Sequence, residues 1–167
     1  FLGDPTARTK IDYFVNQTDP IVSLGVFSGA GEGVSLFSSF AALLSFNLDG
    51  RFKGLSQIIS WSALDEQQHS DGGCALFRHL DNEGLVSDDQ KRQIVEGFEA
   101  VLDNEDHFLE KIFNGYSLSC IDRDDLWHYL RYRANDRLNE IHISHRFSYN
   151  KEKSDRIRQW FEPILKG

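Results

Sequence analysis

The chain has 167 residues and a formal charge of −8 at pH 7, with an isoelectric point near 5.2. This length suits one domain with a sizeable core, and the acidic balance predicts no binding to nucleic acid or to an anionic membrane surface. Hydrophobic residues make up 40% of the chain, which excludes a disordered protein. The two cysteines, Cys74 and Cys120, form no C-x-x-C motif, so we expect free thiols in a reducing compartment, the cytoplasm.

The distribution of proline and apolar residues predicts an all-α bundle in a single domain over residues 1–167. Proline occurs only at positions 5, 20 and 163, so the strongest helix breaker is absent from the long interior of the chain. Apolar residues recur at helical rather than alternating spacing. We expect helices over about 20–47, 54–80, 87–113 and 123–143, with a shorter helix near 154–163.

The first of these helices lies in a segment, residues 21–48, with a single ionisable side chain, Glu32. A membrane-spanning helix needs roughly 20 apolar residues, but six serines, four glycines and the central glutamate make insertion into a bilayer costly. We therefore expect no membrane span but a helix buried within the bundle. A carboxylate buried there needs a partner or a metal ion.

Glycines surround this carboxylate, at Gly29, Gly31 and Gly33. Each glycine weakens a helix by about 1 kcal/mol relative to alanine. A helix loosened around its only charge predicts a local bulge that re-aims the Glu32 side chain, as π-bulges at functional sites do.

The second predicted helix carries Glu66 and His69, three residues apart and so on one helix face. Glu32 and Glu66 are separated by 34 residues, and the midpoint, Asp49, lies in the expected turn "NLDGRFKG" at residues 47–54. Because a helix rises about 1.5 Å per residue, an antiparallel pair folded there brings both carboxylates to the same height. A lone Glu-x-x-His is usually a solvated helix face. Here Glu32 lies at the same height as Glu66, which favours half of a bundle-type metal site. Two carboxylates and an imidazole suit iron or manganese better than zinc or copper.

The later part of the chain offers weaker signals. Ser87 with Gln90 three residues on predicts an N-cap with a capping box. The run Glu105-Asp106-His107 has no metal-binding spacing and is expected on a solvated face. His142 and His145 have a spacing that can bind zinc, but no third ligand lies nearby, so we do not favour a zinc site. The three tryptophans are expected to pack rather than to relay electrons.

Four stretches, in order along nearly the whole chain, resemble one family. They are "GEGVSLFSSF" (31–40), "DEQQH" (65–69), "YLRYRANDRLNEI" (129–141) and "RIRQWFEPIL" (156–165). The chain resembles the C-terminal half of the small, radical-generating subunit of ribonucleotide reductase. The resemblance implies an incomplete ferritin-like helical bundle, completed by another polypeptide. It also implies two metal ions, with iron preferred and iron–manganese or manganese as alternatives. In the family this centre generates a radical, usually on tyrosine, that the large subunit uses to make deoxyribonucleotides.

The resemblance assigns roles to individual residues. Glu32, Glu66 and His69 match the three metal ligands of this half. Asp65 matches a carboxylate that orients a metal-bound histidine of the other half and joins the radical-transfer route, with a plain surface charge as its alternative. Leu36 and Phe40 match the walls of an apolar pocket beside the metals, with core packing as the alternative.

The sequence also departs from the family. Ser62 stands where a bulky apolar residue is more usual, and Gly167 falls about where the family's docking tail begins. No tyrosine of the chain matches the radical position; the five are Tyr13, Tyr116, Tyr129, Tyr132 and Tyr149. The first half of the ligand set is not in this sequence, and the sequence contains no methionine.

The resemblance, with half of the ligand set missing, implies three partners. They are a separate polypeptide carrying the N-terminal half, a second copy of the small subunit, and the large subunit. Alone, the chain is expected to expose the apolar faces of its first two long helices and to aggregate. Two other interpretations stay open, another ferritin-like di-metal oxidase or oxygenase, and a non-catalytic helical module with a vestigial half-site.

Overall fold

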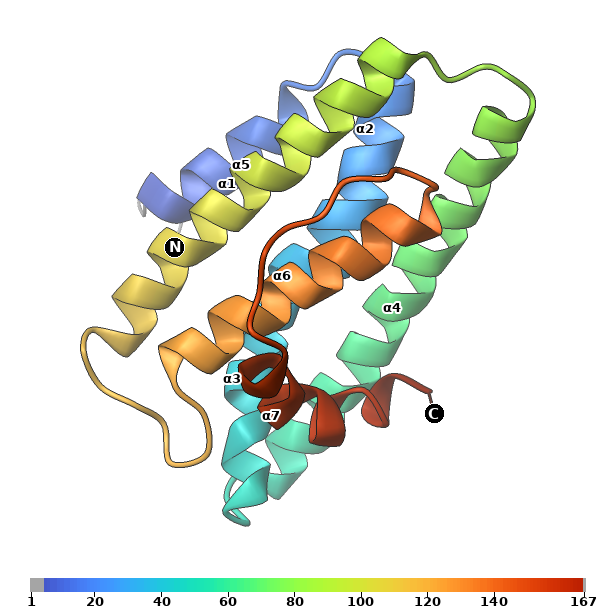
Figure 1. Ribbon diagram of the computed structural model, residues 1–167. Coiled ribbons are helices and arrows are strands. Elements are labelled where there is room, and N and C mark those ends of the chain that lie inside the picture. Colours follow the sequence, from blue (N-terminus) through green and yellow to red (C-terminus); the bar gives the residue numbers. More distant parts are fainter. Residues whose placement is uncertain (1–4, 167) are drawn as a thin grey trace.

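The structure is a computed structural model that describes residues 5–166, and these fold into helices with no strand among them (Figure 1). The predicted all-α class is therefore confirmed. In chain order the elements are α1 (Pro5–Val15), α2 (Pro20–Val26), the π-helix η1 (Phe27–Ser35), α3 (Leu36–Leu48), α4 (Lys53–Asn82), α5 (Asp88–Phe113), α6 (Arg123–Glu140), α7 (Lys151–Phe161) and the 3₁₀ turn η2 (Ile164–Lys166).

The elements α2, η1 and α3 form one uninterrupted helix, Pro20–Leu48, which we call the core helix. It begins with Asp19, whose side chain accepts hydrogen bonds from the backbone N–H groups of Ile21 and Val22. The core helix runs through the middle of the molecule in Figure 1, and α4, α5 and α6 all pack against its π-helical segment. Of its most apolar stretch of 18 residues, 67% is buried inside the protein, as expected for a core helix.

The π-helix η1 contains Glu32 at its centre, so the predicted local bulge is confirmed. The glycines have a second use that the sequence did not reveal. A Cβ atom at Gly33 would lie 2.7 Å from Cδ of Arg137 and 2.8 Å from Oγ of Ser70. Glycine therefore both loosens the helix here and lets α4 and α6 approach its backbone closely.

A short turn joins the core helix to α4 and makes the two antiparallel. Gly50 takes a positive φ of 73° there, a conformation that favours glycine. Hydrogen bonds from Ser119, Cys120 and Arg51 lower the pKa of Asp49 to about 2. This carboxylate thus ties the turn to the loop between α5 and α6.

Most helix ends follow the sequence signals, but α7 spans Lys151–Phe161 where a helix near 154–163 was expected. The capping box is present, since the Ser87 side chain accepts from the Gln90 backbone and the Gln90 side chain accepts from the Ser87 backbone. The helix predicted over 123–143 ends earlier, with α6 stopping at Glu140. Helix α1 was not predicted, because its 11 residues carry little apolar periodicity beyond Tyr13 and Phe14.

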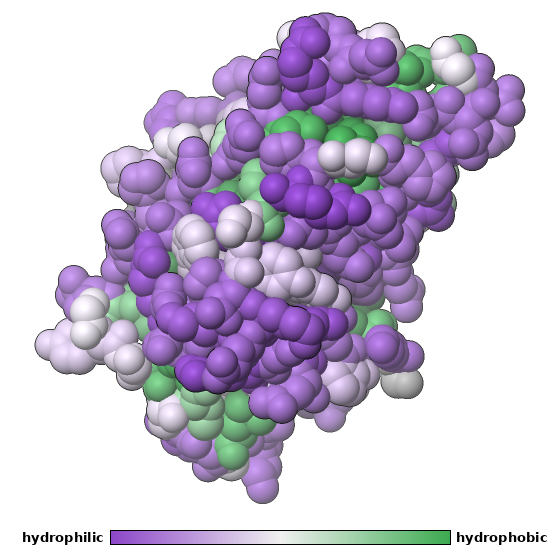
Figure 2. Space-filling model, in the orientation of Figure 1, coloured by the Kyte–Doolittle hydropathy of each residue, from purple (hydrophilic) through white to green (hydrophobic). Residues whose placement is uncertain are grey.

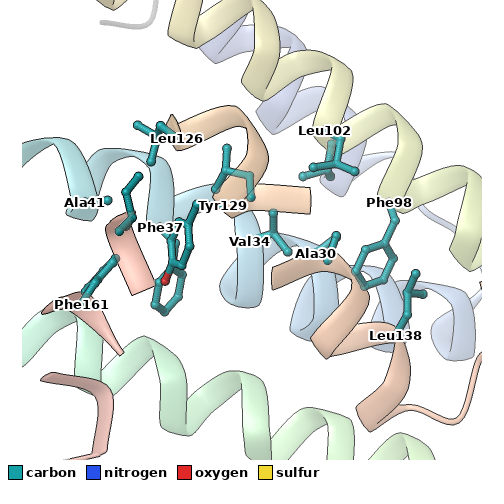
Figure 3. Close-up of a cluster of buried hydrophobic side chains, with 14 of the residues drawn as sticks. Ala30, Val34, Phe37, Ala41, Phe98, Leu102, Leu126, Tyr129, Leu138 and Phe161 are labelled. Carbon is teal, nitrogen blue, oxygen red and sulfur yellow. The ribbon is translucent and has the colours of Figure 1, made fainter. Parts of the chain in front are cut away.

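The main core is built around the core helix. In Figure 3 Ala30, Val34, Phe37 and Ala41 of that helix lie among side chains from α5, α6 and α7. The labelled partners are Phe98, Leu102, Leu126, Tyr129, Leu138 and Phe161. Fully burying one large apolar side chain contributes about 1.5–3 kcal/mol, which explains why this helix carries so few charges.

The surface in Figure 2 is mostly hydrophilic, with apolar patches that include the end where α3 and α4 meet. Large apolar side chains are exposed along the core helix and α4, namely Phe27, Leu36, Leu48, Leu55, Ile58, Trp61 and Leu76. Their exposure agrees with the expected open faces of the first two long helices, while aggregation itself stays a prediction. The expectation that every tryptophan packs is wrong for Trp61, which is 63% exposed.

Candidate metal centre

Three potential metal ligands meet between the core helix and α4. One side-chain ligand atom from each of Glu32, Glu66 and His69 lies within 4.8 Å of the other two. Nδ1 of His69 is 3.7 Å from Oε2 of Glu66 on the same face of α4. Within residues 5–166, no other set of three or more acidic, histidine or cysteine side chains is grouped in this way.

The local fold explains this meeting. The turn at residues 49–52 lies midway between Glu32 and Glu66, so the antiparallel helices bring the two carboxylates level, as the spacing predicted. Glu32 comes from the π-helix, and Glu66 and His69 from successive turns of the regular helix α4.

The cluster is open toward solvent on its α4 side. The Glu66 side chain is 27% exposed and the His69 side chain 54%. Asp65 is 67% exposed, with Oδ1 3.9 Å from Nε2 of His69. Its expected role, orienting a histidine from elsewhere, stays a prediction, but its carboxylate is accessible to such a group.

The electrostatics of the cluster favour a cation. Burial raises the pKa of Glu32, the negative charge of Glu66 raises it further, and His69 offsets part of this. Two carboxylates that repel each other in a half-buried place are stabilised when a positive ion sits between them. The donor set of two carboxylates and one imidazole therefore fits an iron or manganese ion.

The residues expected beside the metals follow Glu32 along the core helix and are not enclosed. Leu36 is 36% exposed. Phe40 is half-buried and makes an edge-to-face contact with Phe37, their ring centroids 5.6 Å apart. Ser39 is half-buried and Ser62 exposed. The role of Leu36 and Phe40 as pocket walls stays a prediction.

The expectation of a solvated face is wrong for Glu105, whose exposure is 0%. The Ser35 hydroxyl donates to its Oε1 at 2.9 Å and the Ser38 hydroxyl to its Oε2 at 2.5 Å. Glu105 lies four residues before Leu109, on the buried face of α5, which is the helical signal that could have shown its burial. Of the Glu105–His107 run only His107 is exposed, since Asp106 is half-buried and paired with Arg123.

Sequence reasoning also missed Arg133, which is 2% exposed. Its guanidinium lies between the core helix and α4, donating to the Gly33 carbonyl and to the Gln67 side chain. Gly33 and Gln67 each directly follow a candidate ligand in the sequence. Its position seven residues after Leu126, on the apolar face of α6, was the available signal.

The histidines near the end of α6 form no site with a third ligand among the described residues. Helix α6 ends at Glu140, so His142 and His145 do not share a helical face. His142 is exposed with a φ of 59°, and the His145 ring contacts the Phe147 ring with centroids 4.6 Å apart.

Both cysteines are free thiols. Burial raises the pKa of Cys74 to about 11. The Cys120 thiol donates a hydrogen bond to Asp49 at 3.0 Å, which raises its pKa. Because the thiolate is the reactive form of cysteine, both raised pKa values disfavour reactivity, and the bystander role stays a prediction.

Comparisons with known proteins agree with the family that the sequence resembles. Residues 3–154 match a sequence model of the family described as "Ribonucleotide reductase, small chain". The "Probable ribonucleoside-diphosphate reductase small subunit 376L" of Invertebrate iridescent virus 6 is 35% identical over 108 residues, covering 61% of this chain and 30% of that protein. Its counterpart 048L of Invertebrate iridescent virus 3, named in the same words, is 33% identical over 129 residues, covering 75% of this chain and 34% of that protein.

The chain thus spans about a third of the length of these viral relatives. The family match covers all three candidate ligands and most of the helices, from α1 to the start of α7. The helical architecture is the one expected for a ferritin-like small subunit. On these grounds, the chain belongs to the ribonucleotide reductase small-chain family.

Proposed function

We propose that this chain is part of a ribonucleoside-diphosphate reductase small subunit and supplies half the ligands of its dinuclear metal centre. The observation that carries the proposal is the meeting of Glu32, Glu66 and His69 within 4.8 Å in a chain of this family. The radical produced at the centre then serves the large subunit in making deoxyribonucleotides.

Each ligand has a distinct task in this proposal. Glu32 and Glu66 would supply flexible carboxylate oxygens to the metal ions. His69 would supply a ring nitrogen, and its side chain is 54% exposed. When bound, two metal ions, with iron preferred and manganese as the alternative, supply the one-electron oxidising capacity of the centre. The carboxylates must lose their protons first, so metal binding releases protons.

The remaining ligands come from a polypeptide segment outside this sequence in our proposal, and we favour a separate N-terminal chain. Three observations support a partner on the α4 side. The ligands are accessible there, Asp65 points its carboxylate outward, and Trp61 exposes an apolar surface nearby on the same helix. We further propose a second copy of the small subunit and the large subunit as partners. The free thiols support a cytoplasmic location.

Metal analysis of the reconstituted complex tests the proposal. The chain is co-expressed with a segment carrying Asp, Glu-x-x-His and a nearby Tyr, and the metal content of the purified complex is measured. Anomalous scattering at the iron and manganese edges identifies and places the ions. We expect two ions per complex, lost in Glu66→Ala and retained in Glu99→Ala, which changes an exposed glutamate on α5.

A folded complex that binds neither iron nor manganese, and that is indifferent to Glu66→Ala, contradicts the proposal and supports a non-catalytic helical module.

A further inference from the structure

A buried arginine joins the two helices that carry the candidate ligands. Nε of Arg133 donates to the Gly33 carbonyl at 2.7 Å, and Nη2 donates to Oε1 of Gln67 at 2.8 Å. Gly33 directly follows Glu32 in η1, and Gln67 directly follows Glu66 in α4. One guanidinium on α6 thus contacts the chain one residue beyond each carboxylate ligand.

The surroundings compensate the cost of burying this cation. Nη1 of Arg133 lies 3.6 Å from Oε1 of Glu162, and the guanidinium carbon lies 3.6 Å from the centre of the Phe37 ring. A buried charge is tolerated when it is paired and hydrogen-bonded, and a cation over an aromatic face gains further attraction. Arg133 is therefore held in one place from several sides.

The acceptor on α4 is also held in one orientation. The amide nitrogen of Gln67 donates to Oδ1 of Asp71 at 2.8 Å, one turn further along the helix. This leaves the amide oxygen of Gln67 facing Arg133. A continuous set of hydrogen bonds therefore runs from the backbone of η1, through Arg133 and Gln67, to Asp71 on α4.

The place where Arg133 binds the core helix matters. A π-helix departs from regular helical hydrogen bonding and recurs at functional sites, so its backbone needs external support to hold one geometry. The guanidinium fork is planar and presents donors in fixed directions, unlike the single ammonium group of lysine.

We infer that Arg133 is a positioning residue that sets the separation of Glu32 and Glu66 by fastening η1 to α4 beside each ligand. The inference rests on the proposed function, since it concerns how the same centre is held. Residues that orient metal ligands typically change metal affinity 10–100-fold when replaced.

The test uses the reconstituted small-subunit complex with Mn²⁺ as the probe. Dissociation constants are measured by calorimetry, and the bound ion is examined by electron paramagnetic resonance. Arg133→Met keeps the aliphatic length but removes every donor, so we expect Mn²⁺ affinity to fall about 10–100-fold with an altered spectrum. Arg133→Lys should recover part of the affinity, because its ammonium can reach one acceptor but cannot hold both.

A matched control lies on the same helix. Arg131 stacks on Trp127, with the guanidinium carbon 3.8 Å from the ring centre, and its nearby carboxylates, Asp103 and Asp106, belong to α5. Arg131→Met should leave the affinity and the spectrum unchanged, even if it lowers the melting temperature. A purely structural Arg133 would behave in the same way, so the two variants separate positioning from stability.

If Arg133→Met does not fold, a second variant still tests whether Arg133 positions the ligands. Gln67→Leu removes the acceptor on α4 while leaving the contacts of Arg133 with Gly33 and Glu162 in place. Unchanged Mn²⁺ affinity and spectrum in Gln67→Leu, or in a folded Arg133→Met, overturn the inference and leave the proposed function intact. Failure of the unsubstituted complex to bind any Mn²⁺ or iron overturns the proposed function and this inference together.

Discussion

Around its π-helical segment, the core helix contacts two carboxylates in very different environments. On the α5 side, Glu105 is completely buried and receives hydrogen bonds from Ser35 and Ser38. On the α4 side, Glu32 lies against a second carboxylate, Glu66, and burial together with that charge raises its pKa. The first arrangement is satisfied by the fold itself, whereas the second gains stability from a bound cation.

One helix can therefore both stabilise the fold and carry a candidate metal ligand. The hydroxyl groups of Ser35, at the end of η1, and Ser38, in α3, hold Glu105 and thereby fasten the core helix to α5. The ligand side keeps a repulsive pair that costs stability in the metal-free state, which is a common feature of functional sites. Substitutions on the two sides should therefore affect different measurements.

The largest expected effect is on metal binding. Glu32→Gln should weaken binding of iron or manganese to the complex more than about 100-fold, beyond the usual range for residues that only orient ligands. Glu105→Gln should change metal affinity far less while lowering the melting temperature. Metal titration and thermal unfolding of both variants check this pair. Equal loss of metal in both variants would contradict the contrast between the two sides.

The next effect concerns the open α4 side. The chain alone should self-associate, because Ile58 and Trp61 are 57% and 63% exposed on α4. Trp61→Lys should shift the population toward monomer, as measured by analytical ultracentrifugation. Tyr116, which is 79% exposed on the loop between α5 and α6, provides the control in Tyr116→Lys. A monodisperse, folded, metal-free sample of the unsubstituted chain would show that this side needs no partner.

A smaller effect is expected on the α5 side. Ser38→Ala removes one donor to the buried Glu105 carboxylate and should lower the free energy of unfolding by about 1–3 kcal/mol. Chemical denaturation of the reconstituted complex measures this change. Ser148→Ala, at an exposed position, should stay within about 0.5 kcal/mol of the unsubstituted protein. A Ser38→Ala variant as stable as the control would mean that the hydroxyl does not support Glu105.

The smallest effect is a pH dependence of the metal-free protein. Folding raises the pKa of Glu32 above its ordinary value of 4.5, so the folded state binds the proton more tightly than the unfolded state. This contribution is fully present below pH 4.5 and is lost as the pH rises through the raised pKa. Glu32→Gln should therefore gain melting temperature relative to the unsubstituted protein as pH rises above 4.5.

Metal affinity should follow the opposite trend and increase over the same pH range, because binding requires the ionised carboxylate. Melting curves and metal titrations at matched pH values test the two trends together. A constant difference in melting temperature across the range would indicate that Glu32 has the same pKa in the folded and unfolded states.

Much of the ligand cluster could be predicted from local patterns. The 34-residue separation of Glu32 and Glu66, centred on a turn, required only the regular rise of two antiparallel helices. The glycines around Glu32 predicted the π-bulge through their weak helix propensity. The capping box at Ser87 and Gln90 likewise depends on residues three apart.

Local patterns did not predict how α5 and α6 are rotated about the core helix. That rotation buries Glu105 against Ser35 and Ser38, about 70 residues earlier, and brings Arg133 to the Gly33 carbonyl, 100 residues away. The same packing supports α1, whose own sequence pattern is weak.

The sequence by itself determined the helical class, the level pair of carboxylates and the weak point in the helix that carries Glu32. Each of these depends on spacing or propensity within one helix or one hairpin. Only the tertiary structure decided which polar side chains support that helix from outside, as Glu105 and Arg133 do. Their partners are distant in sequence, and burial of a charged group becomes favourable only when those partners are brought into place.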